Sequence, residues 1–277
     1  MTQEKTERLR QDIKAYFKNL PEDIYPANLK NGTSVFLSGS TGWGIQEGFD
    51  EKADWDLHLI LEDGRHAQLV QKYGSDHVID DKKNSPIVFG QIRSRSWLRE
   101  RLDRLAQGDC TYTWIYNNCV MIQDPLGIAR MAVENLELLR ANLEELLKYH
   151  FVTFCVRRFD AASTAKRGIE AGARLANAEM SKAALQTMSL LHGKPYPYNK
   201  WLAKHVCILG EDGKRCVELV EKALKSASLE EIIGNAKVLR NFLEQEATQR
   251  LGAKPWITQW WKFNQNPPEI RWVDKHS

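Results

Sequence analysis

The chain has 277 residues, of which 43% are hydrophobic and 27% charged, and its formal net charge is +3. These are the proportions of a soluble globular protein that is long enough for one large domain or two ordinary ones. The small charge argues against nucleic acid as a partner, and no stretch approaches the roughly 20 apolar residues of a membrane span.

The chain begins with a charged, amphipathic segment. Leu9, Ile13, Phe17 and Leu20 recur at helical spacing, and Pro21 ends the predicted helix. Because the segment lacks the apolar core of a signal peptide, we expect a cytoplasmic protein.

Strand patterns then alternate with helix patterns. The segment ADWDLHLILE, residues 53–62, alternates most clearly, with Asp54, Asp56 and His58 on the face opposite its apolar residues. The other predicted strands are 33–39, 85–94 and 118–127. Helical periodicity appears at 65–74 and 94–108.

From about Ile128 to about Arg250 the sequence is helix-forming, with interruptions at 192–201 and 209–215. The tail from 251 to 277 is rich in Trp and Pro and should pack on the body as irregular structure. We therefore predict an α+β protein with a sheet domain at 1–127, an all-α helical bundle at 128–250, and the tail.

Two clusters interrupt the strand pattern in a way that indicates chemistry. The first, Ser38-Gly39-Ser40, ends one predicted strand, and the second, Asp54-Trp55-Asp56, begins the next. Aspartates at i and i+2 on a strand share one face, which suits two oxygen-ligated cations such as Mg²⁺. Gly39 allows the backbone to approach a phosphate closely, and Ser40 offers an N–H and a hydroxyl.

Gly39-Ser40, a loop of thirteen residues, and Asp54-Trp55-Asp56-Leu57 together resemble the signature of the DNA polymerase β-like nucleotidyltransferase superfamily. The architecture is similar to that of its antibiotic nucleotidyltransferases, up to about residue 250. The resemblance implies a small mixed sheet with flanking helices, followed by a helical bundle. It also implies that Asp54 and Asp56 hold two Mg²⁺ ions, while Gly39 and Ser40 bind the β- and γ-phosphates of a nucleoside triphosphate.

One position departs from the family, which usually supplies a third carboxylate from the next strand of the sheet. Here that strand offers Phe89, Gln91 and Arg93, and we place Gln91 at the catalytic position. An amide oxygen can ligate a cation weakly but cannot take a proton. The sequence does not choose among the acids that could replace it, which are Glu100, Asp103 and Asp109.

A second feature is the turn HGKPYPYNKW, in which Asn199 is expected to cap a helix that begins at Lys200. A similar turn in related small-molecule nucleotidyltransferases presents a lysine to the nucleotide, so the resemblance implies a nucleotide-binding role for Lys200. An ordinary exposed lysine explains the pattern about as well.

Other features carry less weight. His58 is expected to be a hydrogen-bonded structural residue, and the basic segment 93–104 an exposed face with ion pairs. Trp43 is a candidate for stacking on a base or sugar. An acidic cluster would suit a cationic acceptor, although solvated loop acids explain it equally well; it consists of Glu47, Asp50 and Glu51.

The sequence thus predicts a metal-dependent enzyme that transfers a nucleoside monophosphate, AMP from ATP in the simplest case, to a hydroxyl of a small-molecule acceptor with release of pyrophosphate. Two alternatives stay open. One is a catalytically weakened nucleotide- or partner-binding protein that keeps the fold, which Gln91 favours. The other is transfer to a protein or RNA. The acceptor, the preferred base and the oligomeric state are not determined by the sequence.

Overall fold

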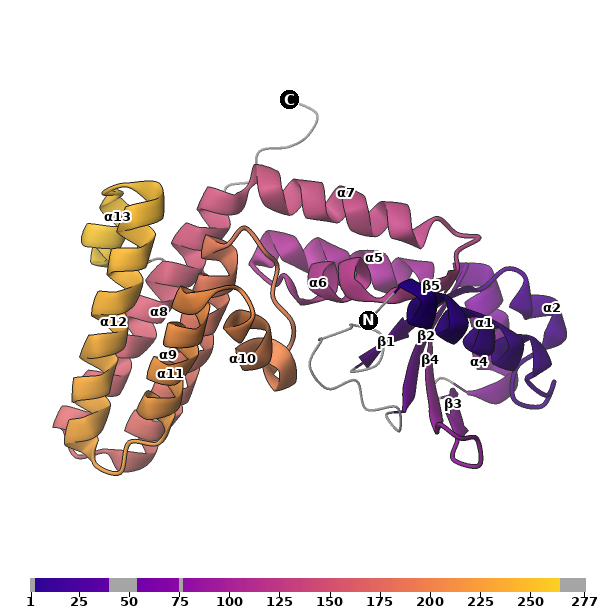
Figure 1. Cartoon of the computed structure of the whole chain (residues 1–277), viewed down its shortest axis with the longest axis horizontal. Coiled ribbons are helices and arrows are strands. Elements are labelled where there is room, and N and C mark those ends of the chain that lie inside the picture. The colour runs from indigo at the N-terminus through magenta and orange to yellow at the C-terminus, as the bar shows by residue number, and fades with distance from the viewer. Residues whose placement is uncertain (1–2, 40–53, 75–76, 265–277) are drawn as a thin grey trace. The chain divides into compact units, whose positions relative to one another are not determined.

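The computed structural model describes residues 3–39, 54–74 and 77–264 (Figure 1). The chain forms two compact units: residues up to Arg104 with Tyr112–Leu136, and Leu105–Thr111 with the chain from Glu137 onward. The division therefore falls inside helix α7 (Ile128–Ala141), beyond the expected boundary at 127/128. The first unit contains a sheet and the second is helical, so the α+β prediction is confirmed.

The first unit is built on one five-stranded mixed sheet with the order β3-β4-β2-β1-β5. β2 and β4 run parallel, and the other neighbouring pairs are antiparallel. The strands are β1 (Ser34–Ser38), β2 (Trp55–Leu61), β3 (Val78–Asp81), β4 (Val88–Ser94) and β5 (Val120–Gln123). All but β3 lie within the predicted segments, and β3 was missed because VIDD is too short to show alternation.

One face of the sheet carries the hydrophobic core of this unit. Val35 and Leu37 of β1 and Leu57 and Leu59 of β2 are fully buried there, together with Ile13 of α1. The alternation read from the sequence thus faces the core as predicted. The helices and the 3-10 turn η1 are α1 (Gln3–Asn19), α2 (Ala27–Lys30), α4 (Asp63–Tyr73), α5 (Arg95–Asp103), η1 (Arg104–Gln107) and α6 (Thr111–Asn118).

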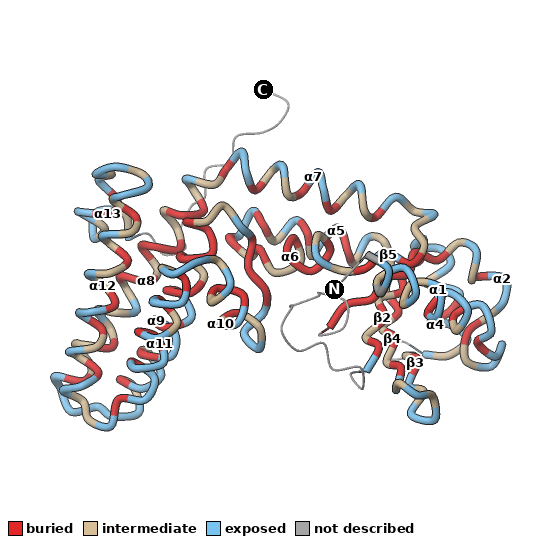
Figure 2. Tube along the Cα trace, viewed as in Figure 1, coloured by how far each residue is buried: buried red, intermediate tan, exposed pale blue. Residues whose placement is uncertain are grey.

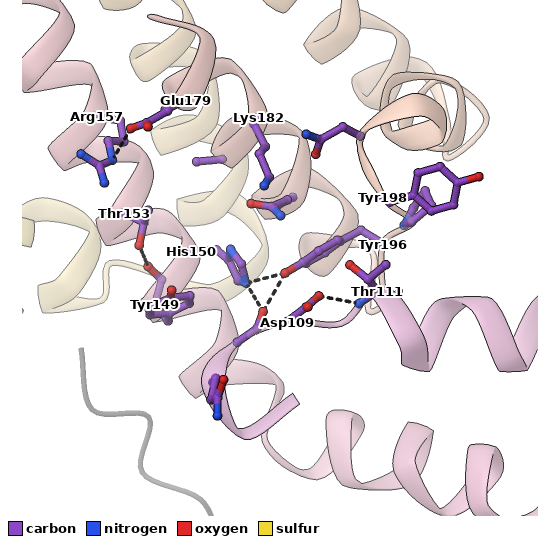
Figure 3. Close-up of a pocket in the computed structure, with 16 residues that line it drawn as sticks. Asp109, Thr111, Tyr149, His150, Thr153, Arg157, Glu179, Lys182, Tyr196 and Tyr198 are labelled. Carbon is purple, nitrogen blue, oxygen red and sulfur yellow. Dashed lines mark hydrogen bonds and ion pairs between the residues drawn. The ribbon is translucent and has the colours of Figure 1, made fainter. Parts of the chain in front are cut away.

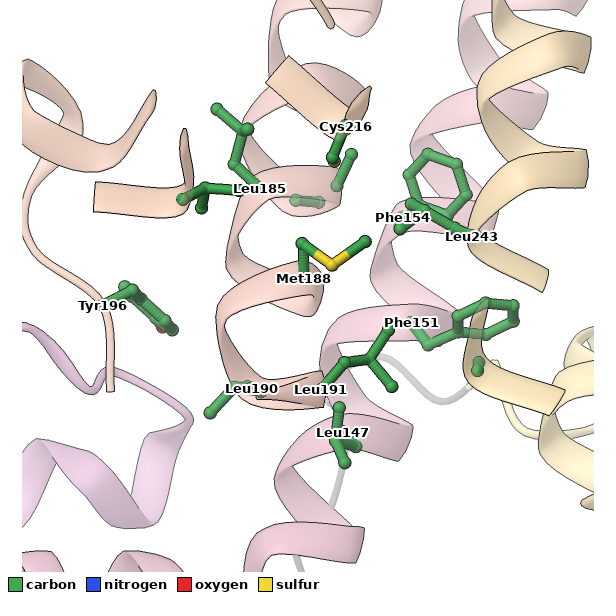
Figure 4. Close-up of a cluster of buried hydrophobic side chains, with 14 of the residues drawn as sticks. Leu147, Phe151, Phe154, Leu185, Met188, Leu190, Leu191, Tyr196, Cys216 and Leu243 are labelled. Atoms are coloured by element: carbon green, nitrogen blue, oxygen red, sulfur yellow. The ribbon is translucent and has the colours of Figure 1, made fainter. Parts of the chain in front are cut away.

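The second unit is a bundle in which α8 (Leu143–Lys166), α9 (Glu170–Leu191), α11 (Glu211–Leu224) and α12 (Leu229–Leu251) pack together. Their buried faces form one large cluster, which includes Phe151, Phe154 and Met188 (Figure 4). The start of α12 is capped by side chains: Ser228 Oγ accepts from Glu231 N at 3.1 Å, and Glu231 Oε2 accepts from the N–H of Ala227, the residue before the N-cap, at 2.9 Å.

The remaining elements of the bundle are α10 (Asn199–Cys207), α13 (Pro255–Thr258) and η2 (Trp260–Lys262). Buried and exposed residues alternate along the helices of the bundle (Figure 2). In the described part of the tail, Trp256 and Ile257 are buried, and the Trp256 ring lies 5.7 Å from that of Phe151. This part of the tail forms two short helical turns, and Trp256 and Ile257 belong to the buried cluster of the bundle. Among the described helices, none has both the length and the apolar character needed to cross a membrane.

Candidate functional site

The first half of the predicted motif ends β1, and the second half begins β2 beside it. The antiparallel register pairs Ser38 with Asp56, and Ser38 Oγ donates a hydrogen bond to the Asp56 carbonyl oxygen at 3.1 Å. Ser38 and Asp56, which lie eighteen positions apart in the sequence, are therefore neighbours at one edge of the sheet. Ser40 lies outside the described residues, so its predicted phosphate contact stays a prediction.

Gly39 directly contacts the carboxylate of Asp56. A Cβ atom placed on Gly39 would lie 2.0 Å from Asp56 Oδ2, far inside van der Waals contact. The backbone of Gly39 also has a φ of 69°, in the left-handed region that disfavours residues with a side chain. Both observations require glycine at position 39. The first also shows that this requirement comes from the close approach of the Asp56 carboxylate.

Asp54 and Asp56 lie on the sheet face opposite the hydrophobic core. Asp54 is exposed and immediately precedes β2, while Asp56 is partly buried. Their Cα atoms are separated by two strand residues, about 7 Å. Carboxylate oxygens are the ligands that Mg²⁺ prefers. Because Gly39 has no side chain, its backbone lies directly beside the Asp56 carboxylate. Among the described residues, however, no group of three or more Asp, Glu, His or Cys side chains is placed to hold a metal ion.

The parallel register of β2 and β4 shows what occupies the third position. Phe89 is the neighbour of Asp56, and Gln91 is the neighbour of His58. Gln91 lies on the expected face, since it alternates with the buried Gly90 and Ile92. Its register position lies two residues beyond that of Asp56, a diagonal separation of about 8 Å.

The missed strand β3 brings a further acid to the same face. Asp80 pairs with Phe89, which in turn pairs with Asp56. Two strand spacings, about 10 Å, separate Asp80 from Asp56, too far for both carboxylates to bind one ion. Asp80 instead lies 3.1 Å from Lys82 in an exposed ion pair.

His58 is held by Tyr116 of α6, an element that the sequence did not reveal. The hydroxyl of Tyr116 lies 3.0 Å from Nδ1 of His58, and the Tyr116 ring also packs edge-on against Phe36. Burial, reinforced by the positive charge of Arg93, lowers the pKa of His58 to about 4. His58 is thus a neutral, hydrogen-bonded residue at neutral pH, as expected.

The basic segment that begins at Arg93 forms ion and ring contacts. Arg95 Nη1 lies 3.0 Å from Glu62 Oε1, and Arg93 and Arg101 lie over the ring of Trp97 at 5.4 and 5.3 Å. Glu100, one of the alternative acids, lies 4.0 Å from Arg104. The segment has the ion-paired character that was expected of it.

Three predicted residues belong to the helical unit. Lys200 is exposed in the first turn of α10, with Nζ 5.2 Å from the ring centre of Trp201. The prediction that Asn199 caps this helix is wrong: Asn199 is its first residue, and Tyr198 occupies the cap position, where its side chain makes no capping hydrogen bond. Asp109, another alternative acid, accepts a hydrogen bond from Thr111 N at 2.9 Å.

Several candidates lie outside the described residues. They are Trp43 and the acidic cluster of Glu47, Asp50 and Glu51.

Comparison with known proteins gives a partial match among solved structures. No family model matches the chain, and no curated protein does. Among solved structures, the chain is similar to a nucleotidyltransferase-like protein from Exiguobacterium sibiricum 255-15, with a TM-score of 0.45 and 15% identity over 84% of this chain and 74% of that one. Similarity at this level is too low to carry a function from one protein to the other.

Proposed function

We propose that this protein is a metal-dependent nucleotidyltransferase of the small-molecule type, which moves a nucleoside monophosphate, AMP from ATP in the simplest case, onto a hydroxyl group and releases pyrophosphate. The observation that carries the proposal is the contact between Gly39 and the Asp56 carboxylate. It supports a single site made from the two halves of the sequence motif.

The roles of the residues follow from their chemistry. Asp54 and Asp56 would hold Mg²⁺, because both carboxylates face away from the core and belong to the same edge of the sheet. When bound, divalent cations stabilise the charge that develops on the transferred phosphoryl group. Gly39 keeps the backbone open to a phosphate, Ser40 donates to it, and Lys200 balances negative charge on the triphosphate.

A non-catalytic nucleotide-binding protein is the second candidate, and the β2–β4 register favours it. The residue beside Asp56 is Phe89, and the residue beside His58 is Gln91. Neither side chain can accept a proton from an attacking hydroxyl. The acceptor could also be a protein or an RNA, which would use the same chemistry.

A pyrophosphate-release assay separates these candidates. The protein would be incubated with Mg²⁺, each nucleoside triphosphate in turn and a panel of hydroxylated small molecules. We expect release with at least one pair, and its loss by orders of magnitude in Asp56→Asn but not in Asp12→Asn. Asp12 is an exposed acid of α1, so its replacement changes the charge equally. Binding of nucleotide without release under any condition would favour the non-catalytic candidate.

A further inference from the structure

The helical unit contains a pocket of its own, with a volume of about 710 Å³ (Figure 3). Its lining comes from four segments of this unit: 107–111, α8, α9 and the turn at 196–199. The volume is that of an ordinary small-molecule site. None of its lining residues belongs to the sheet unit.

The floor of the pocket fixes the hydrogen-bonding state of His150. Tyr196 donates its hydroxyl to the Gly108 carbonyl at 2.6 Å, and Nε2 of His150 lies 2.8 Å from the same oxygen. A carbonyl oxygen only accepts, so Nε2 must carry the hydrogen. Burial lowers the pKa of His150 to about 4. The imidazole is therefore neutral at neutral pH, and its Nδ1 atom is an acceptor.

The Nδ1 lone pair of His150 is available to a ligand. His150 is only 4% exposed, and among the described residues no hydrogen bond to Nδ1 is formed. In Figure 3 this nitrogen faces the side of the pocket on which Lys182 lies. A ligand that fills the pocket would cover this acceptor, so a ligand group that donates to Nδ1 is favoured over one that leaves it unpaired.

The charge of Lys182 limits which chemical group of a ligand can bind to Nδ1 of His150. Its ammonium points from α9 toward His150, and its charge lowers the pKa of His150 further (Figure 3). A carboxylate or phosphate would accept from Lys182 but would turn lone pairs toward the Nδ1 lone pair. An ammonium would donate to Nδ1 but would be repelled by Lys182. A hydroxyl group satisfies both, because it accepts from one and donates to the other.

The charges of the pocket also favour a neutral ligand. The formal charges of the lining residues cancel, because two are acidic and two are basic: Asp109, Glu179, Arg157 and Lys182. Arg157 Nε lies 2.9 Å from Glu179 Oε2, so these two largely neutralise each other. Asp109 offers carboxylate oxygens to further donors, and the part-buried ring of Tyr149 offers an apolar surface.

We propose that this pocket binds an uncharged polyhydroxylated molecule, a monosaccharide or a cyclic polyol, one hydroxyl of which bridges Lys182 and His150. The proposal rests on residues of the helical unit alone and does not depend on nucleotide transfer.

The test is a saturation-transfer NMR titration of the whole chain without nucleotide or metal. The probes are glucose, ribose and myo-inositol, with inorganic pyrophosphate and ethanolamine as charged probes. We expect at least one neutral probe to bind more tightly than either charged one.

Two variants locate the binding. Lys182→Gln should weaken it about tenfold, the loss of one charge-assisted hydrogen bond. His150→Gln should weaken it about fivefold, because the amide can still donate to Gly108 but no longer offers the Nδ1 lone pair. Lys222→Gln, an exposed lysine of α11 outside the pocket, should bind as the unmodified chain does.

Three results would overturn the proposal. The first is that no neutral probe binds, and the second is that binding is unchanged in Lys182→Gln. The third is that pyrophosphate binds more tightly than every polyol and is lost in Lys182→Gln, which would make the pocket an anion site. Because Lys182 is exposed, Lys182→Gln should fold, and its binding can be measured even if His150→Gln fails to fold.

Discussion

Replacement of Gly39 by alanine tests the packing at the centre of the proposed site. Two costs are expected. A residue with a side chain at a φ of 69° carries backbone strain of about 1–2 kcal/mol. The new Cβ would also lie 2.0 Å from Asp56 Oδ2, so the carboxylate must move, at about 1–3 kcal/mol for overpacking. Gly39→Ala should therefore lower the free energy of unfolding by about 2–5 kcal/mol.

Gly127 provides the matched control. It lies in the same unit, has a φ of 70°, and a Cβ placed on it would meet nothing within 4 Å. Gly127→Ala should therefore show the strain alone, about 1–2 kcal/mol. The difference between the two variants isolates the contact with Asp56.

Urea unfolding followed by tryptophan fluorescence would measure these values. In a chain that already carries Asp56→Ala, the cost of Gly39→Ala should fall toward that of Gly127→Ala, because the clashing carboxylate is gone and only the Cβ of residue 56 remains, 3.0 Å from the new Cβ. The reasoning is refuted if Gly39→Ala and Gly127→Ala cost the same in the unmodified chain. It is also refuted if Asp56→Ala leaves the cost of Gly39→Ala unchanged.

Three further predictions concern charge. Lys200→Ala should weaken nucleotide binding, measured by calorimetry, by about 1.5–3 kcal/mol. Lys204→Ala is the control and should not weaken it, since the Lys204 ammonium also lies near the Trp201 ring, at 5.7 Å. Equal nucleotide affinities of the two variants would show that Lys200 is an ordinary surface lysine. Gln91→Glu should raise Mg²⁺ affinity, and an unchanged magnesium dependence would exclude Gln91 from the site. The free energy of unfolding should fall as the pH is lowered from 6.5 to 4, because the unfolded imidazole of His58 takes up a proton that the folded one, with a pKa of about 4, refuses. His58→Gln should reduce that slope by up to about 1.4 kcal/mol per pH unit, and an identical slope would contradict the lowered pKa.

Periodicity revealed most of the elements that position the site. The alternation in 53–62 predicted which residues of β2 face the core, and Leu57 and Leu59 are buried as it required. The helix that ends before Pro21 was equally clear, since α1 ends at Asn19. These features depend on local sequence spacing, which is why they could be read without coordinates.

Features that depend on register or on short elements could not be read in this way. Phe89 rather than Gln91 is the neighbour of Asp56, and only the pairing of β2 with β4 decides which of the two it is. β3 and α6 were missed, and with them Asp80 and the Tyr116 partner of His58. The acceptor state of His150 follows from a contact with Gly108, 42 residues away in the sequence.

The most direct test of the proposed site is calorimetric binding of a non-hydrolysable ATP analogue, with and without Mg²⁺, to the unmodified chain, Asp56→Asn and Asp12→Asn. If Asp56 holds a metal that bridges to the nucleotide, Mg²⁺ should tighten binding to the unmodified chain and to Asp12→Asn, and should have little effect on Asp56→Asn. An equal effect of Mg²⁺ on all three proteins would contradict the assignment of Asp56 as a metal ligand.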